Sequence, residues 1–170
     1  DIDGHTTYTT SLTVLPNGHL ASGSCDNSIK IWNPENGSLL RTLSGHTGCV
    51  WSLAVLSNGY LASGSYDKSI KIWNPEDGSL IRTLTGHDNY VASLTVLTNG
   101  YLASGSWDYS IKIWNPEDGS LIRTLTGHTN LITSLTLLPN GYLASGAGGD
   151  SIKIWNPENG SLIRTLKGHS

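Results

Sequence analysis

Histidine, serine and aspartate, the residue types of a catalytic triad, recur at constant spacing along this chain of 170 residues. One such set is His46, Ser63 and Asp67. In a serine hydrolase these groups would act as base, nucleophile and orienting acid. That chemistry needs one exposed serine beside an oxyanion hole, whereas this set recurs and its serine precedes a glycine within a predicted strand. The pattern favours a scaffolding role, and we predict no catalytic residue.

The sequence supports metal or phosphate chemistry no better. All the histidines except His19 follow a glycine at the same place in each repeat, and no two have the spacing of metal ligands. The glycines belong to turns and to Ser-Gly pairs, so no phosphate loop is present. We therefore predict no metal and no cofactor.

The elements that position these residues repeat with a period of 41 residues, as the distance from His46 to His87 shows. A repeat of this length indicates a supersecondary unit that buries its apolar faces against copies of itself. We define the units by their first histidines: 5–45, 46–86, 87–127 and 128–168.

Within the second unit, short runs of β-branched and apolar residues bounded by turn residues predict four strands. These runs are 52–56, 61–65, 70–73 and 80–84. Asn58-Gly59 suits a tight turn, and the five residues from Asn74 to Gly78 suit a longer one. The prediction is a four-stranded antiparallel meander without helices, because no sustained 3.6-residue apolar stripe is present.

This arrangement resembles the WD-repeat β-propeller, whose blades are four-stranded sheets. The shared features are Gly-His, an aspartate in the turn between the second and third strands, and a tryptophan six residues later; Trp-Asn stands where the family name has Trp-Asp. The resemblance covers the whole chain. It implies an all-β protein in which residues 1–170 form a single four-bladed propeller segment.

The resemblance also implies a structural tetrad in each blade, a hydrogen-bonded line from the loop into the third strand. The sets are His5, Ser22, Asp26 and Trp32; His46, Ser63, Asp67 and Trp73; His87, Ser104, Asp108 and Trp114; and His128, Ser145 and Trp155. The fourth set lacks its aspartate, because Gly149 occupies that place and Asp150 comes one residue late. We therefore expect the fourth blade to be the least stable.

Composition limits the partners and the location. The net charge of −3 and the lack of a Lys/Arg run predict no binding to nucleic acid or to an anionic membrane. No apolar run is long enough to span a bilayer or resembles a secretory leader. Cys25 and Cys49 are too few for a disulfide framework, so we expect free thiols in a cytoplasmic protein. Both lie in loops at the same end of adjacent units, which leaves a disulfide open.

The positions that differ between units gather in two stretches, the five residues after each histidine and the four around the tetrad aspartate. In an up-and-down meander both stretches lie at the same end, which we call the variable face. The opposite end, made of the Asn-Gly and Asn-Pro-Glu turns, is the uniform face. Aromatic residues are enriched in protein interfaces, whereas neutral drift in loops would not favour one face. The predicted partner-binding residues are Tyr8, Cys49, Trp51, Tyr66, Tyr90, Trp107, Tyr109 and Leu131.

We therefore predict a non-enzymatic scaffold that presents the variable face to a protein or peptide, as the same loops do in the family it resembles. One alternative is an isolated or engineered propeller fragment whose main property is self-assembly, which the absence of Met and the near-identity of the units would fit. Another is an enzyme with a site in the central channel. The first strands offer no acid or base for it, since they contain only Ser, Leu, Thr, Ala and Val.

Four blades of this family type would span about half a circle and leave two apolar faces open. We predict that a second copy covers them, giving a homodimeric eight-bladed ring with a twofold axis. Gly168-His169 of one copy would then compete with Gly4-His5 of the other for one loop site. A strained four-bladed monomer is the alternative.

Overall fold

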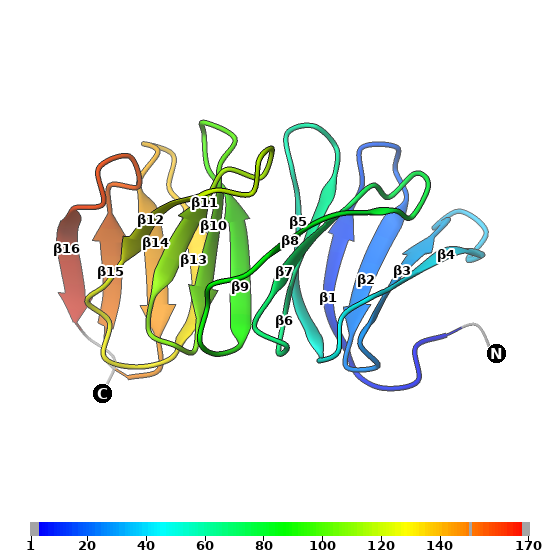
Figure 1. Cartoon of the computed structure of the whole chain (residues 1–170), viewed down its shortest axis with the longest axis horizontal. Helices are drawn as coiled ribbons and strands as arrows, with labels where there is room; N and C mark the ends of the chain where they lie inside the picture. The colour runs from blue at the N-terminus through cyan, green and yellow to red at the C-terminus, as the bar shows by residue number, and fades with distance from the viewer. Residues whose placement is uncertain (1–3, 150, 168–170) are drawn as a thin grey trace.

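The computed structural model describes residues 4–149 and 151–167, which form four antiparallel sheets arranged side by side like an open fan (Figure 1). Every regular element among these residues is a strand. The first and the fourth sheets lie at opposite sides of the fan. The strands are β1 (Thr9–Val14), β2 (Leu20–Ser24), β3 (Ser28–Trp32), β4 (Leu39–Ser44), β5 (Val50–Val55), β6 (Leu61–Ser65), β7 (Ile70–Trp73), β8 (Leu80–Leu84), β9 (Val91–Val96), β10 (Leu102–Ser106), β11 (Ile111–Trp114), β12 (Leu121–Leu125), β13 (Ile132–Leu137), β14 (Leu143–Ala147), β15 (Ser151–Trp155) and β16 (Leu162–Lys167).

Each sheet consists of four consecutive strands paired in chain order, so the sheets are meanders. In the second sheet β6, β7 and β8 have the predicted bounds, but the first strand does not. It runs over Val50–Val55 instead of 52–56, because pairing continues to Val50 opposite Ser65 across an irregularity between Val50 and Ser52. A bulge of this kind adds one unpaired residue without ending the strand. Trp51 therefore lies within β5 and not in the loop before it.

Neighbouring sheets pack through apolar faces. Between the second and third sheets, Ile70 and Leu84 on one side meet Val91, Leu94 and Trp114 on the other. Burial of such side chains is the main favourable contribution to this kind of packing, at about 25 cal/mol per Å² of apolar surface. The sheets thus depend on each other for their cores, as the repeat predicts.

A glycine in the second strand of each sheet permits this close packing. A Cβ atom added at Gly64 would lie 2.7 Å from Cγ1 of Val91 in the next sheet. Such a contact is too short for any side chain, so glycine is required where another backbone element approaches. Gly23 and Gly105 have the same relation to Val50 and Ile132.

Two recurring hydrogen bonds also join adjacent sheets. The N–H of Leu94 in β9 donates to Oγ of Ser52 in β5 at 3.0 Å, and Leu53 and Leu135 make the same contact with the sheets before theirs. The guanidinium of Arg82 donates to the carbonyls of Asp118 at 3.0 Å and Glu117 at 2.7 Å in the next sheet. Arg41 and Arg123 repeat this contact, which we call the arginine clamp.

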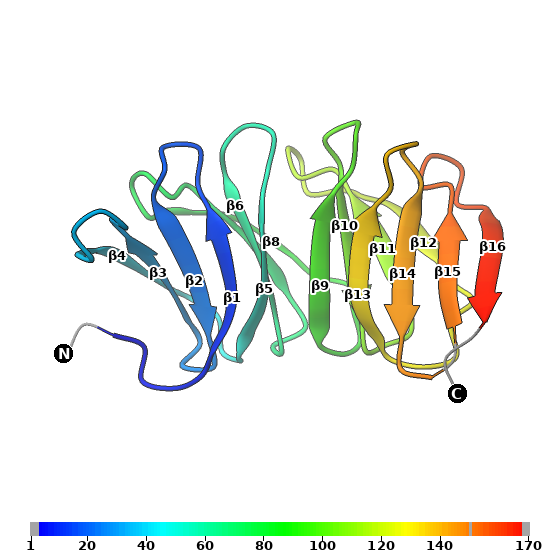
Figure 2. The ribbon, with the colours of Figure 1, turned by 180° about the vertical axis from the view of Figure 1, so that it is seen from behind.

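The two outer sheets of the fan have apolar faces that no other described residue covers. Leu12 on β1 is 61% exposed, whereas its counterparts Leu53 and Leu94 are 9% and 8% exposed. At the other end Leu166 on β16 is 43% exposed, whereas Leu84 is 3% exposed. Figure 2 shows β1 and β16 toward opposite sides of the fan.

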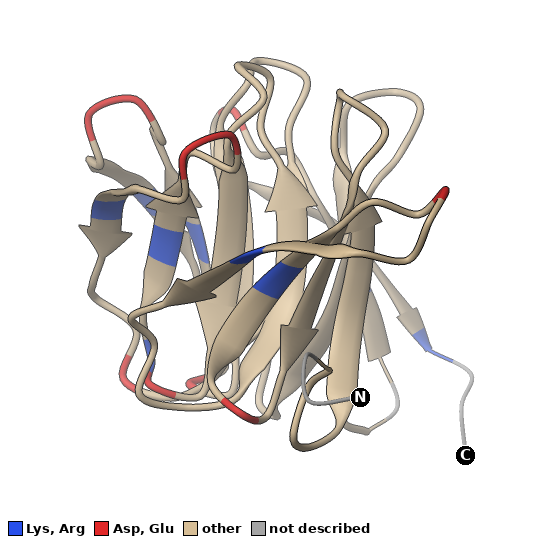
Figure 3. Ribbon diagram, turned by 90° about the vertical axis from the view of Figure 1, so that its right-hand side faces the viewer, with Lys and Arg blue, Asp and Glu red and all other residues tan. Residues whose placement is uncertain are grey.

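The charged residues follow the layout of the blades. In Figure 3 Asp and Glu lie in loops at both ends of the sheets, whereas most Lys and Arg lie on the strands. Lys71, for example, reaches across to Oγ1 of Thr83 at 3.0 Å. Across residues 4–149 and 151–167 the structure contains no helix long and apolar enough to cross a membrane.

Candidate functional site

The predicted tetrad residues lie in hydrogen-bonded lines in the first three sheets. In the second sheet Nε2 of His46 is 2.7 Å from Oγ of Ser63, and Nδ1 of His46 is 2.7 Å from Oδ2 of Asp67. The indole N–H of Trp73 donates to the same serine at 2.8 Å. His5, Ser22, Asp26 and Trp32, and His87, Ser104, Asp108 and Trp114, repeat these contacts.

Ser63 is fully buried and its hydroxyl also donates to the carbonyl of Lys71. A hydroxyl offers one donor and two acceptor positions, and the contacts with Trp73, His46 and Lys71 use them. No substrate can reach this oxygen, so the geometry favours the scaffolding role over a triad.

Asp67 joins three segments of its blade. Its carboxylate accepts hydrogen bonds from His46, from the N–H of Thr47 at 3.0 Å, and from both the N–H and the hydroxyl of Ser69 at 2.9 and 2.6 Å. Burial alone would raise the pKa of Asp67, but the hydrogen bonds from His46 and Ser69 outweigh it and hold this pKa well below its usual range. The ionised carboxylate therefore ties the loop after β4 to the turn before β7.

The fourth tetrad is incomplete among the residues that the structure describes. His128 contacts Oγ of Ser145 at 2.6 Å, and Trp155 donates to the same oxygen at 2.8 Å. Gly149 occupies the aspartate position with a φ of 110°, a value that residues other than glycine rarely adopt. Asp150 lies outside the described residues. Burial and the nearby charge of Lys153 lower the pKa of His128 to about 4.

On the variable face a backbone hydrogen bond joins the two variable loops of each sheet. In the second sheet the N–H of Tyr66 donates to the carbonyl of Cys49 at 2.9 Å, and in the third the N–H of Trp107 donates to the carbonyl of Tyr90 at 3.0 Å. We call the two joined residues a rim pair. The four rim pairs are Tyr8 with Cys25, Cys49 with Tyr66, Tyr90 with Trp107, and Leu131 with Gly148.

Four of the predicted partner-binding residues lie together in one aromatic cluster. Tyr66 stacks on Tyr90 with ring centroids 4.1 Å apart and on Trp51 at 5.0 Å. Trp107 tilts against both tyrosines, at 5.7 and 5.2 Å. Burial, together with the neighbouring Tyr90, raises the pKa of Tyr66. The aromatic cluster, Trp51, Tyr66, Tyr90 and Trp107, thus spans the second and third sheets.

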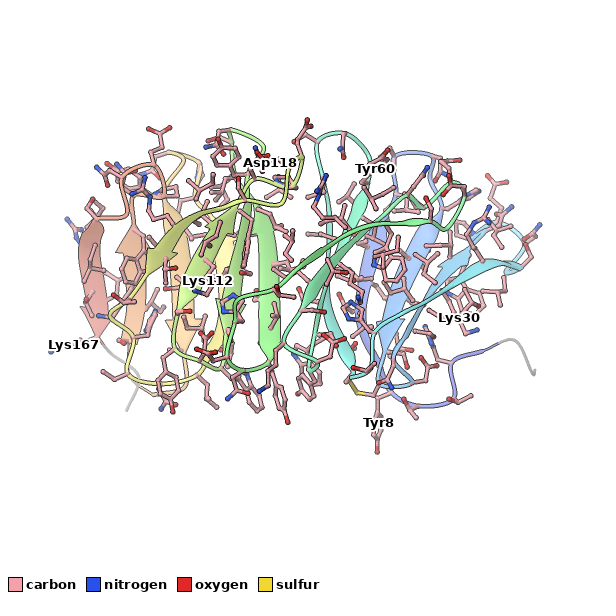
Figure 4. The ribbon with its side chains drawn as sticks, in the orientation of Figure 1. Tyr8, Lys30, Tyr60, Lys112, Asp118 and Lys167 are labelled. Atoms are coloured by element: carbon pink, nitrogen blue, oxygen red, sulfur yellow. A yellow bond between two sulfur atoms is a disulfide. The ribbon has the colours of Figure 1, made fainter. Side chains whose placement is uncertain are left out.

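Sequence reasoning did not find the contacts within this cluster, because its central stack, Tyr66 on Tyr90, joins two different units. Tyr109 lies beside it in the chain, is 46% exposed, and has a φ of 70° in the turn after β10. Leu131 is half-buried. Tyr8 is 83% exposed and points away from the ribbon at the lower edge of Figure 4, opposite Tyr60 and Asp118.

The expectation of free thiols is wrong, since Cys25 and Cys49 form a disulfide between the first and second sheets. The rim position of Cys25 lies next to the rim position of Cys49 in the following sheet, which brings the two sulfurs together. Cys49 is buried, so its side chain is not accessible to a partner. Disulfides are rare in cytosolic proteins, so the cysteines no longer support the predicted cytoplasmic location.

The uniform face is hollowed between its turns. One cavity of about 520 Å³ has Leu56, Thr98, Tyr101, Pro116 and Glu117 in its lining. A similar cavity of about 370 Å³ lies beside Pro139 and Tyr142. These hollows are made of residues that are nearly the same in every unit, so they offer repeated shapes and little variation.

The described residues contain no group of three or more His, Cys, Asp or Glu side chains that could hold a metal ion. What the arrangement offers is therefore a set of surfaces: an aromatic one at the variable face and a hollowed polar one at the uniform face.

The family model for WD40, described as WD domain, G-beta repeat, matches residues 1–33, 37–74, 78–115 and 119–156. Two similar solved structures are that of U3-55K and the crystal structure of the RRP9 WD40 repeats, each 31% identical with a TM-score of 0.90. The match covers 98% of this chain but 54% and 53% of those chains, so this chain spans about half their length. A search of curated proteins returned no match. The four matched repeats show that this chain belongs to the WD40 repeat family.

Proposed function

We propose that the chain is a non-enzymatic interaction scaffold whose variable face binds a protein or a peptide. The aromatic cluster supports this most directly, because four large side chains stack together on the face whose residues differ between units. Tyr and Trp supply much of the binding energy in protein interfaces. The buried tetrad serines give a hydrolytic alternative no accessible nucleophile.

The stacking suits the cluster to recognition. Tyr66 lies between Trp51 and Tyr90, so its ring is already held in place before a partner arrives. A side chain that is ordered in advance loses less conformational entropy on binding. Trp51 at 38% exposure and Tyr109 at 46% provide accessible apolar area at the edge of this cluster.

The test uses peptides selected on the unmodified chain from a random display library. Trp51→Ala with Tyr109→Asn, where asparagine tolerates the positive φ, removes the exposed aromatic groups at the edge of the aromatic cluster. A matched control, Thr98→Ala with Glu117→Ala, changes the hollow of about 520 Å³ on the uniform face. We expect the first pair to weaken binding at least about tenfold and the second to leave it unchanged. The reverse result would move recognition to the uniform face.

We also propose that the 170-residue chain pairs with a second copy to form an eight-bladed ring. The exposure of Leu12 and Leu166, whose counterparts between sheets are buried, supports this. Exposed apolar faces of sheets are aggregation sites unless covered, and two copies related by a twofold axis cover both. Light scattering at micromolar concentration should give twice the 18.2 kDa mass of one chain; a mass near 18.2 kDa would contradict the ring.

A further inference from the structure

We infer that the junction between two copies repeats the contacts between sheets within one chain, and that it places Tyr8 of the second copy over Gly148, so that the variable face becomes continuous only in the pair. This inference rests on the proposed ring. It goes further by naming the residues of the junction and by giving the second copy a part in the recognition surface.

The two apolar faces that such a junction would join are present on the last and the first sheets. Within the chain, the face formed by Ile70, Ile72 and Leu84 packs on the first strand of the next sheet. The last sheet presents the equivalent Ile152, Ile154 and Leu166 without a neighbour. The first sheet presents the complementary side chains, which are Leu12, Leu20 and Trp32.

The last sheet also carries an empty space of suitable size. A hollow of about 200 Å³ has Leu135, Gly146 and Ile152 in its lining. At the preceding junction the equivalent Gly105 receives Ile132, whose Cγ2 would lie 2.6 Å from an added Cβ. Thr9 of a second copy is the counterpart of Ile132, and its branched side chain fits the space that Gly146 leaves.

The first and last sheets also carry hydrogen-bonding groups whose counterparts join neighbouring sheets within the chain. Among the described residues, the guanidinium of Arg164 has no carbonyl partner, whereas Arg41, Arg82 and Arg123 each clamp the next turn. The turn with the matching carbonyls is that of Glu35 and Asn36 in the first sheet. Ser134 likewise matches Ser52, whose hydroxyl accepts the N–H of Leu94. A second copy would supply acceptors for Arg164 and the N–H of Leu12 for Ser134.

The rim pairs of neighbouring sheets also meet on the variable face. At the first two junctions the second residue of one rim pair contacts the first residue of the next: Cys25 bonds to Cys49, and Tyr66 stacks on Tyr90. After the last pair, Gly148 has no following rim residue within the part of the chain that the structure describes. In a ring the following residue is Tyr8 of the second copy. A bare glycine leaves room for a large ring, and Tyr8 is 83% exposed in the single chain.

Cysteine cross-linking tests this arrangement, because a disulfide already occupies the equivalent position at Cys25 and Cys49. The variant Tyr8→Cys/Gly148→Cys is made in the full chain. An added Cβ at Gly148 would be no closer than 3.4 Å to any atom, an ordinary contact with Asn130. On oxidation we expect a covalent dimer that reductant reverses, with no larger species, because both junctions close within one pair.

The single variants Tyr8→Cys and Gly148→Cys are the controls. A twofold ring keeps the two copies of each position at separate junctions, so neither single variant should cross-link. A covalent dimer from Tyr8→Cys alone would indicate head-to-head pairing, and a ladder of products from the double variant would indicate an open filament. Either result would overturn the inference.

Arg164→Ala gives an independent measurement, with Arg123→Ala as its matched control inside the chain. Loss of two charge-assisted hydrogen bonds at each junction should raise the dimer dissociation constant at least about tenfold, as measured by sedimentation. Arg123→Ala should lower stability and leave the dissociation constant unchanged. A doubled mass without cross-linking and without an Arg164 effect would leave the ring standing and refute this junction, whereas a single-chain mass would refute the ring itself.

Discussion

Tyr66 and Tyr90 stack with ring centroids 4.1 Å apart across the junction between the second and third sheets. One junction earlier, the equivalent positions are joined covalently as Cys25 and Cys49. The same place in the architecture thus holds a disulfide in one case and an aromatic stack in the next. The backbone geometry therefore brings the rim pairs of these neighbouring sheets into contact, and the side chains present determine whether the contact is a disulfide or an aromatic stack.

The disulfide should contribute measurably to stability. Cys25→Ser/Cys49→Ser releases a link between residues 24 apart in the chain, and we expect a loss of about 2–4 kcal/mol in the free energy of unfolding. Urea denaturation with and without reductant measures it. Reductant should lower the urea midpoint of the unmodified chain and leave that of the double variant unchanged. Equal midpoints for the two proteins without reductant would contradict the prediction.

Asp67→Ala should destabilise the chain by about 1–3 kcal/mol, because His46 is left buried without its carboxylate partner. Asp118→Ala is the matched control, since Asp118 also accepts hydrogen bonds in a turn but is exposed. Its replacement should change the free energy of unfolding far less than that of Asp67. Denaturant unfolding measures the free energy of unfolding of both variants. Similar losses in the two would refute a special role for the tetrad aspartate.

Acid should weaken the chain through His128. The pKa of this histidine is about 4 in the folded chain, lowered from its ordinary 6.5 by burial and by Lys153. Between these values the unfolded chain binds more protons than the folded one, so stability falls as the pH falls from 6.5 to 4, by about 2 kcal/mol. Chemical denaturation at several pH values measures the slope.

The control for this pH effect is His128→Gln, which should lose most of the slope whatever its absolute stability. Asp67 and Asp108 contribute little to the slope in this window. The pKa values of Asp67 and Asp108 are held below their usual range, as burial is outweighed by hydrogen bonds, so their stabilisation is lost only at lower pH. An unchanged slope in His128→Gln would assign the effect elsewhere.

The fourth blade should be repairable. Gly149→Asp/Asp150→Asn recreates the Asp26-Asn27 order of the first sheet, in which Asn27 adopts a φ of 68°. We expect a gain of about 1–2 kcal/mol and a rise in the pKa of His128, followed by NMR titration. Gly149→Asp alone should gain less, because the present φ of 110° at that position disfavours a side chain. A pKa unchanged by the double substitution would show that the carboxylate does not reach the histidine.

Local sequence was sufficient for the strands and turns within a unit, because alternating apolar residues and Asn-Gly turns specify them over short distances. Three strands of the second sheet have the predicted bounds. The bulge at Trp51 and the contacts between units were not predictable in the same way. The Cys25 to Cys49 bond and the stack of Tyr66 on Tyr90 depend on how far one sheet is rotated from the next, which no single repeat specifies.

The arginine clamp has a consequence for how such a gene can change length. Each clamp ends on backbone carbonyls, so it forms equally with Asp77, Asp118 or Asn159 in the facing turn. Any unit can therefore follow any other and find its acceptors in place. Addition or removal of one 41-residue unit would therefore leave an arginine clamp available at every remaining junction, whereas the Cys25 to Cys49 bond and the stack of Tyr66 on Tyr90 need their particular neighbours.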